Sequence, residues 1–136
     1  MNGLYDLDQL RSIIIVIDDY TGEEKREGLV ILMEEASEVI QEASKQLRTG
    51  PDFCRKNSDI PNMVYFQQEV MDFLLLLEIA EELGVYTPAT VEVEEEYTRY
   101  KLEKLKNWSG LGYAVQRIQE RNTSKYNPDL VFSTPS

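Results

Sequence analysis

Apolar residues recur every three or four positions along most of the chain, and this spacing predicts amphipathic helices. We expect Thr21 and Gly22 to end the first helix, and Gly50 and Pro51 to end the second. The run SIIIVI at 12–17 is β-branched enough to form a strand, but no other segment offers it a partner. The pattern therefore predicts an all-α fold with helices at about 4–20, 28–48, 65–84, 89–107 and 113–121.

The segment 65–84 is the most apolar of these helices and still carries two carboxylates, Glu69 and Asp72. Because most of its circumference is apolar, we expect neighbouring elements to enclose it and both carboxylates to lie near the protein interior. An ionised carboxylate without a partner there costs on the order of several kcal/mol, so basic side chains or a metal ion should lie beside them. One stripe of the helix, with steps of four and three, holds Tyr65, Glu69, Asp72, Leu76, Ile79 and Leu83.

A second pair of acids, Glu35 and Glu38, borders the apolar seam of the helix 28–48. Residues three apart on a helix face one direction, so antiparallel packing of the two helices would gather four carboxylates, with Glu42 as a conceivable fifth. The chain has no histidine, and an all-oxygen set suits a hard divalent cation such as Mg²⁺, with Mn²⁺ as a substitute. Isolated acid pairs in so acidic a chain more often mark a solvated face, and we assign 92 and 94–96 to that class.

Composition limits the classes of protein to which the chain can belong. Its 136 residues fit one domain, predicted at 1–136 with an irregular tail at about 122–136. The net charge of −11 argues against nucleic-acid binding, and the single cysteine, Cys54, excludes an internal disulfide and suits a reducing compartment. The N-terminus carries no basic signal-like region, and the apolar run 74–77 is too short to span a bilayer. We expect a soluble protein that is located in the cytoplasm and does not bind a membrane.

The acids and their helical setting resemble those of a known family. The segments EEASEVIQEASK (34–45) and EVMDFLLLLEIAEELGV (69–85) resemble the EExxE…ExxD signature of the MazG-like all-α nucleoside triphosphate pyrophosphohydrolases. The resemblance covers about 29–85 and extends more weakly to the next helix. The gap between the two acid pairs is longer than is usual in the family, so the loop 50–62 departs from its pattern. The resemblance implies a bundle of about four to five helices that assembles into an oligomer.

The activity that this resemblance implies is hydrolysis of a nucleoside or deoxynucleoside triphosphate to the monophosphate and pyrophosphate, with Mg²⁺, in the housecleaning of nucleotide pools. The positions that match the family's metal ligands are Glu35, Glu38, Glu69 and Asp72. Glu38 or Glu35 could also act as the general base that takes a proton from the attacking water. The sequence does not distinguish between these two glutamates, nor does it identify the preferred base and sugar.

Other residues could contact a nucleotide. Lys104 and Asn107, on the helix 89–107, could donate to the phosphates, and the family often has basic residues and an asparagine in this region. Phe53 or Tyr65 could stack on the base. The plainer interpretation of these four residues is that the lysine and asparagine lie on a solvated helix face and that the aromatic rings belong to the core.

The amount of apolar surface on the helix 65–84 also bears on assembly. Leu74, Leu75 and Leu77 face away from the stripe of Glu69, so two sides of this helix need cover, which predicts a homodimer or homotetramer. The alternative function is a non-catalytic helical oligomerisation or interaction protein whose acids pair with lysines of a partner helix. A di-iron carboxylate bundle is less favoured because it normally uses Glu-x-x-His pairs and the chain has no histidine.

Overall fold

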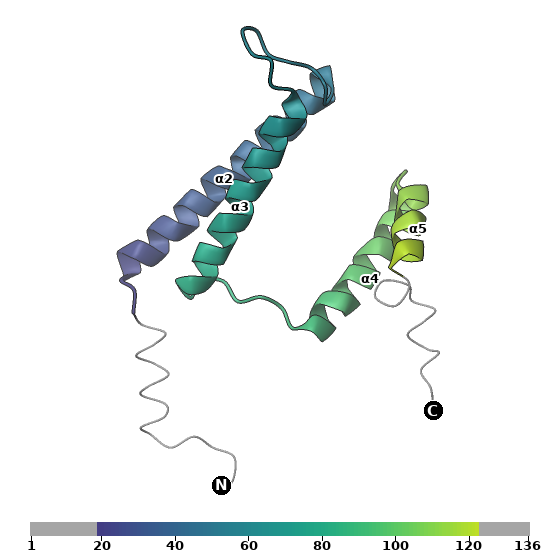
Figure 1. Cartoon of the computed structure of the whole chain (residues 1–136). Helices are drawn as coiled ribbons and strands as arrows, with labels where there is room; N and C mark the ends of the chain where they lie inside the picture. The colour runs from purple at the N-terminus through teal and green to yellow at the C-terminus, as the bar shows by residue number, and fades with distance from the viewer. Residues whose placement is uncertain (1–18, 123–136) are drawn as a thin grey trace, which may run out of the picture. The chain divides into compact units, whose positions relative to one another are not determined.

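A computed structural model describes residues 19–122 of the protein and shows four α-helices (Figure 1). No strand occurs within this range, where the only β-type contact is an isolated bridge between Cys54 and Pro61. The predicted all-α class is therefore confirmed for residues 19–122. The predicted helix 4–20, apart from its last two residues, and the predicted tail beyond residue 122 lie outside the described residues. The helices are α2 (Gly22–Thr49), α3 (Asn62–Glu82), α4 (Val91–Trp108) and α5 (Gly112–Arg121).

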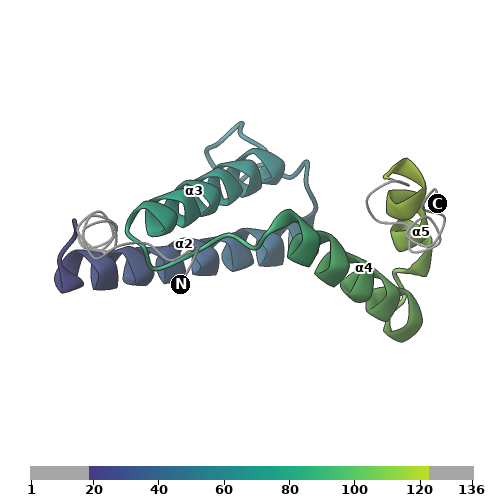
Figure 2. The same cartoon turned by 90° about the horizontal axis from the view of Figure 1, so that it is seen from below.

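The chain divides into two compact units, one up to Thr87 and the other from Pro88 onward. In the first unit, α2 and α3 run antiparallel and side by side, as Figures 1 and 2 both show. In the second unit, α4 packs against the shorter α5. The antiparallel hairpin of the two long helices, which the acid pairs required, is thus present within the first unit.

The helix α2 begins six residues earlier than predicted, because Thr21 starts it instead of ending the preceding segment. The Thr21 hydroxyl accepts a hydrogen bond from the Glu24 amide at 3.1 Å, and the Glu24 carboxylate accepts from the Thr21 amide at 3.5 Å. This reciprocal capping box satisfies two amides at the helix start. The predicted start at Gly28 is therefore wrong. Gly28 lies inside α2, where a Cβ would be 2.3 Å from Leu83 Cδ1, so its missing side chain allows the close approach of α2 and α3.

The loop between α2 and α3 is tied to both helices. Gly50, with φ of 87°, ends α2 where the sequence predicted. The buried Asn62 side chain, 2% exposed, donates to Thr49 Oγ1 at 2.8 Å and to the Gly50 carbonyl at 3.0 Å. The backbone N–H of Asn62 donates to the Phe53 carbonyl at 2.9 Å. The loop therefore folds back on the end of the hairpin instead of extending from it.

The remaining helix boundaries lie within about three residues of those predicted. α3 begins at Asn62 instead of Tyr65, and α4 begins after Thr90, whose hydroxyl accepts from the Val93 amide at 3.3 Å. None of the helices in the described part of the chain is long and apolar enough to cross a membrane.

The hairpin leaves much of its apolar surface uncovered within one chain. Ala80 and Leu83 are buried, but Leu74 and Leu75 are 56% and 53% exposed. The expectation that neighbours enclose α3 is therefore not met by the described residues of a single chain, because two helices can cover only one side of each other. Other large apolar side chains of α2 and α3 that remain exposed include Leu29, Val30, Met33, Ile40, Met71 and Ile79.

Candidate metal centre

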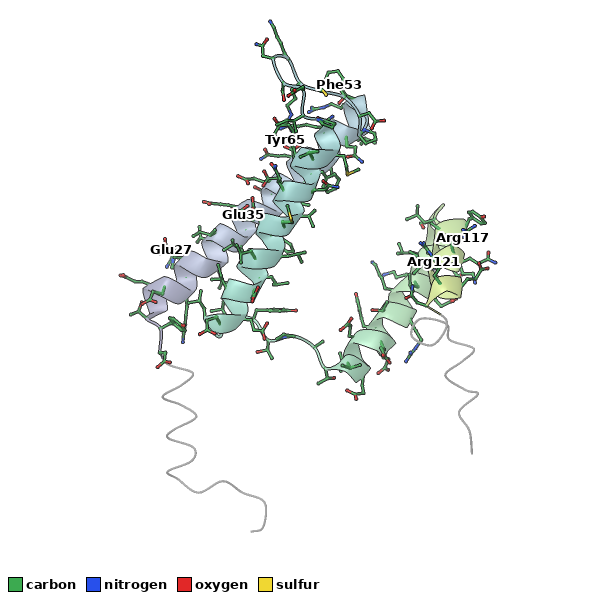
Figure 3. The ribbon with its side chains drawn as sticks, viewed as in Figure 1. Glu27, Glu35, Phe53, Tyr65, Arg117 and Arg121 are labelled. Carbon is green, nitrogen blue, oxygen red and sulfur yellow. The ribbon has the colours of Figure 1, made fainter. Side chains whose placement is uncertain are left out.

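Three carboxylates from the two long helices meet between them. Glu35 of α2 and Glu69 and Asp72 of α3 each offer one oxygen, and these oxygens lie within 4.8 Å of one another. Figure 3 labels Glu35 partway along α2, where α3 runs beside it. The predicted convergence is thus observed for these three residues, which we call the acid cluster. Three carboxylates at this separation repel one another unless a proton or a cation lies among them.

Glu38, the fourth predicted ligand, lies beside the acid cluster but is not part of it. It is exposed, one helical turn after Glu35. A hydrogen bond between its carboxyl group and Glu69 is the largest cause of the raised pKa of Glu69, so the two groups are close together. Glu38 is therefore placed at the open side of the acid cluster.

Burial differs among the members of the acid cluster. Glu35 and Glu69 are half-buried, and the Oε2 atom of each is buried with no hydrogen-bond partner among the residues that the structure describes. Asp72 is exposed, which corrects the expectation that it lies near the interior. The reason is that α2 covers only one side of the α3 stripe and that none of residues 19–87 covers the other side. The acid cluster is accordingly buried at its base and open at Asp72.

Burial and neighbouring carboxylates raise the pKa of two residues of the acid cluster, Glu69 and Glu35. The hydrogen bond with Glu38, burial, and repulsion from Glu38, Asp72 and Glu35 raise the pKa of Glu69 to about 7. Burial and the nearby Glu38 and Asp72 also raise the pKa of Glu35. The charged groups that act most strongly on both residues are other carboxylates, so the acid cluster holds more negative charge than its surroundings offset.

Glu42 shows what a paired carboxylate on the same helix looks like. Burial raises its pKa, but hydrogen bonds from Lys45 at 3.1 Å and Arg55 at 2.5 Å outweigh that effect and bring the pKa below its ordinary value. Glu42 is therefore paired with basic side chains, and it does not belong to the acid cluster. The carboxylate of Glu42 thus belongs to a structural ion pair, whereas Glu35 on the same helix is surrounded chiefly by other carboxylates.

The acid cluster fits a hard divalent cation by its donor chemistry. Its donors are all carboxylate oxygens, Glu35 and Glu69 each have one oxygen buried without a hydrogen-bond partner in the described range, and the raised pKa of both residues indicates uncompensated negative charge. Magnesium prefers a small number of carboxylates and an open side for water and phosphate oxygens, which the exposed Asp72 edge provides. Glu35, Glu69 and Asp72 would therefore hold the ion, with Glu38 adjacent.

The raised pKa of Glu69 predicts how stability depends on pH in the metal-free protein. A group with a folded pKa of about 7 and an ordinary value of 4.5 favours the folded state fully below pH 4.5, and loses that contribution as pH rises through about 7. From this group we expect the free energy of unfolding to fall by on the order of 1 kcal/mol over that window, allowing for solvent screening. Denaturant unfolding in metal-depleted buffer at several pH values measures it.

Glu69→Gln should reduce this dependence, because the amide carries no charge at any pH in the window. Mg²⁺ at alkaline pH should stabilise the wild-type protein more than this variant. The matched control is Glu27→Gln, which removes one exposed acid from the same two-helix unit outside the acid cluster. A Glu69→Gln protein whose stability falls with pH as steeply as that of the wild type would contradict the assignment.

The predicted nucleotide contacts lie in different places. Tyr65 lies one turn before Glu69 on α3, with the Arg55 guanidinium 3.9 Å from its ring centroid, so one face of the ring is already covered. Phe53 is in the loop and is 49% exposed, which leaves its ring accessible (Figure 3). Lys104 and Asn107 are exposed on α4, in the second unit, and their contact with a nucleotide stays a prediction.

Sequence reasoning missed a second group of polar residues at the closed end of the hairpin. A cavity of about 220 Å³ lies there, and Lys45, Arg48 and Arg55 are among its lining residues. None of these three basic residues is among the nucleotide contacts predicted above. The available signal was the pair Lys45 and Arg48, three residues apart at the end of a helix.

Comparisons of the chain with protein-family models, with curated proteins and with solved structures find no match. The assignment of function consequently depends on the residues and geometry of the acid cluster and on the motif resemblance.

Proposed function

We propose that the protein is a Mg²⁺-dependent nucleoside triphosphate pyrophosphohydrolase of the MazG-like kind. The observation that carries this proposal is the meeting of Glu35, Glu69 and Asp72 within 4.8 Å, with Glu38 beside them and no basic side chain among the strongest influences on Glu35 and Glu69. A triphosphate approaching an acidic surface needs cations that offset its charge, and an open carboxylate site supplies them. The spacing of these acids along α2 and α3 is the feature that resembles the family.

The residues of the site would have different roles according to their positions. Glu35, Glu69 and Asp72 hold the ion, which, when bound, neutralises phosphate charge and activates water. The half-buried Glu35 and Glu69 fix the base of the site, while Asp72 at the open edge meets the substrate side. Hydrolysis breaks one P–O bond of the anhydride bridge between the α and β phosphates. The water oxygen bonds to the phosphorus that loses the bridge, the bridging oxygen leaves with the other product, and a proton is released.

Glu38 is the better candidate for the general base, although the sequence left Glu35 equally eligible. Glu35 belongs to the acid cluster, where its charge is needed for the ion, whereas Glu38 is exposed and outside the set of mutually close oxygens. A carboxylate that is near the ion but not bound to it keeps a lone pair available to accept the proton of the attacking water.

The test of this function is incubation with a panel of ribonucleoside and deoxyribonucleoside triphosphates in the presence of Mg²⁺. We expect release of pyrophosphate and the matching monophosphate from at least one nucleotide, with no release when the ion is removed by a chelator. Detection of both products separates this reaction from stepwise phosphate removal. Absence of products from every nucleotide of the panel, in a protein shown to be folded, would overturn the proposal.

The exposed apolar surface of the hairpin supports a homodimer or homotetramer within this proposal. Leu74 and Leu75 on α3 and Met33 and Ile40 on α2 are more than half exposed, and such surface is normally covered by a partner. The same surface also favours the second candidate function, a non-catalytic helical oligomerisation protein. The nucleotide panel distinguishes the two, because only the enzyme consumes a triphosphate.

A further inference from the structure

The cavity of about 220 Å³ at the closed end of the hairpin concentrates positive charge in an acidic protein. Three of the 14 basic residues of the chain, Lys45, Arg48 and Arg55, line it, whereas the whole chain carries a net charge of −11. Glu42 accepts hydrogen bonds from Lys45 and Arg55 and offsets one of these charges, so the cavity and its immediate wall keep an excess of about two positive charges. An excess of this sign in this chain requires an explanation.

The basic side chains of the cavity have more hydrogen-bond donors than acceptors within the described part of the chain. Arg48 makes no ion pair there, and the Nε of Arg55 is buried without an acceptor. Among residues 19–122, the Lys45 ammonium donates to Glu42 alone. A guanidinium has five donor hydrogens and an ammonium has three, so these groups keep donors for a further anion.

The wall of the cavity is built by residues from three segments that brace one another. Asn62 at the start of α3 donates to Thr49 at the end of α2, and Thr49 in turn donates to the Lys45 carbonyl at 3.0 Å. Arg55 is held over the Tyr65 ring at 3.9 Å and against Glu42. Lys45 and Arg55 are therefore held by contacts within the fold, which lowers the entropic cost of holding a ligand, whereas the Arg48 side chain is exposed.

A simpler role for these basic residues is to complement the carbonyl groups at the C-terminal end of α2, and it explains part of the arrangement. Arg48 lies in the last turn, where a cation complements the carbonyl end of the helix. That role does not account for Arg55, which comes from the loop, or for the exposed Phe53 ring beside it.

We propose that this cavity is a binding site for a phosphate or diphosphate group. Guanidinium groups and a lysine around a small cavity match the charge and hydrogen-bonding geometry of phosphate oxygens. The volume is below the usual range for a whole small-molecule ligand, so it fits one anionic group and leaves Phe53 for an adjoining ring. The site contains no member of the acid cluster and does not depend on the proposed function.

The shared chemistry is a phosphate group, and it can come from free pyrophosphate or from a nucleotide. Isothermal titration with pyrophosphate, with a nucleoside monophosphate and with a nucleoside diphosphate distinguishes these sources. The buffer is stripped of metal on a resin, because a dissolved chelator is itself an anion and because metal would bridge phosphate to the acid cluster. We expect pyrophosphate to bind under these conditions and binding to weaken with added salt.

Arg48→Gln should weaken pyrophosphate binding by about tenfold or more, the size expected for loss of a hydrogen bond to a charged group. The matched control is Arg26→Gln, which removes the same charge from an exposed position on the same helix outside the cavity and should leave binding within about twofold. Phe53→Ala should leave pyrophosphate binding unchanged. If it weakens nucleotide binding alone, the phosphate belongs to a nucleotide; if it weakens neither, the ligand is free phosphate or pyrophosphate.

The site is overturned if pyrophosphate and nucleotides all fail to bind in metal-depleted buffer. It is also overturned if Arg48→Gln and Arg26→Gln weaken binding equally, since that result would indicate attraction to charge in general. Both outcomes leave the hydrolytic activity at the acid cluster untouched, because that activity is measured with Mg²⁺ present. Failure of hydrolysis with retained pyrophosphate binding would overturn the proposed function alone.

Discussion

Asp72→Asn should abolish Mg²⁺-dependent release of pyrophosphate, with a loss of at least about 10²-fold in kcat/KM. The substitution removes the charge from the exposed member of the acid cluster while keeping the side chain's size, so the helices should keep their packing. Affinity for Mg²⁺ should fall with activity, because the site loses one of three closely spaced carboxylates. Product release measured by ion-exchange chromatography and metal binding measured by titration test both statements.

The control for this result is Glu27→Gln, which removes a negative charge from an exposed position on α2 (Figure 3). We expect its activity to stay within about twofold of the wild type, because a surface charge outside the site contributes little. Circular dichroism establishes that both variants are helical. An active Asp72→Asn protein with unchanged Mg²⁺ affinity would remove Asp72 from the metal centre.

Glu38→Gln should lower kcat by about 10² to 10⁴-fold and leave Mg²⁺ affinity nearly unchanged. The reason is its position: Glu38 is exposed beside the acid cluster but outside the three oxygens that lie within 4.8 Å of one another. An amide in its place cannot accept the proton of water. Steady-state kinetics over a range of pH, together with direct titration of Mg²⁺, measures both quantities.

Glu35→Gln provides the comparison that separates a base from a ligand. Because Glu35 belongs to the acid cluster, its amide variant should lose Mg²⁺ affinity as well as rate, and part of the rate should return at high Mg²⁺ concentration. Glu38→Gln should not be rescued in this way. If added Mg²⁺ restores Glu38→Gln and fails to restore Glu35→Gln, the two roles are reversed.

Local patterns in the sequence were sufficient for most of the helical framework. The stop at Gly50 and the helix start at about residue 89 agree with the structure to within a few residues, because these signals act over one turn of helix. The start of α2 was misjudged because Thr21 and Gly22 were interpreted as a stop, when Thr21 and Glu24 form a capping box. The pattern also predicted that this helix begins at Gly28, whereas Gly28 lies inside α2 and faces Leu83 across the hairpin contact.

The sequence by itself determined which acids could share a helical face, since Glu35 and Glu38, and Glu69 and Asp72, are each separated by one turn. Only the tertiary structure decided which of them meet. The register of α2 against α3 brings Glu35 to Glu69 and Asp72 and leaves Glu38 at the edge, and the folded loop brings Arg55 to Glu42. The physical reason is that one helix fixes the spacing of its own residues, whereas a contact between helices depends on their packing and on the path of the loop.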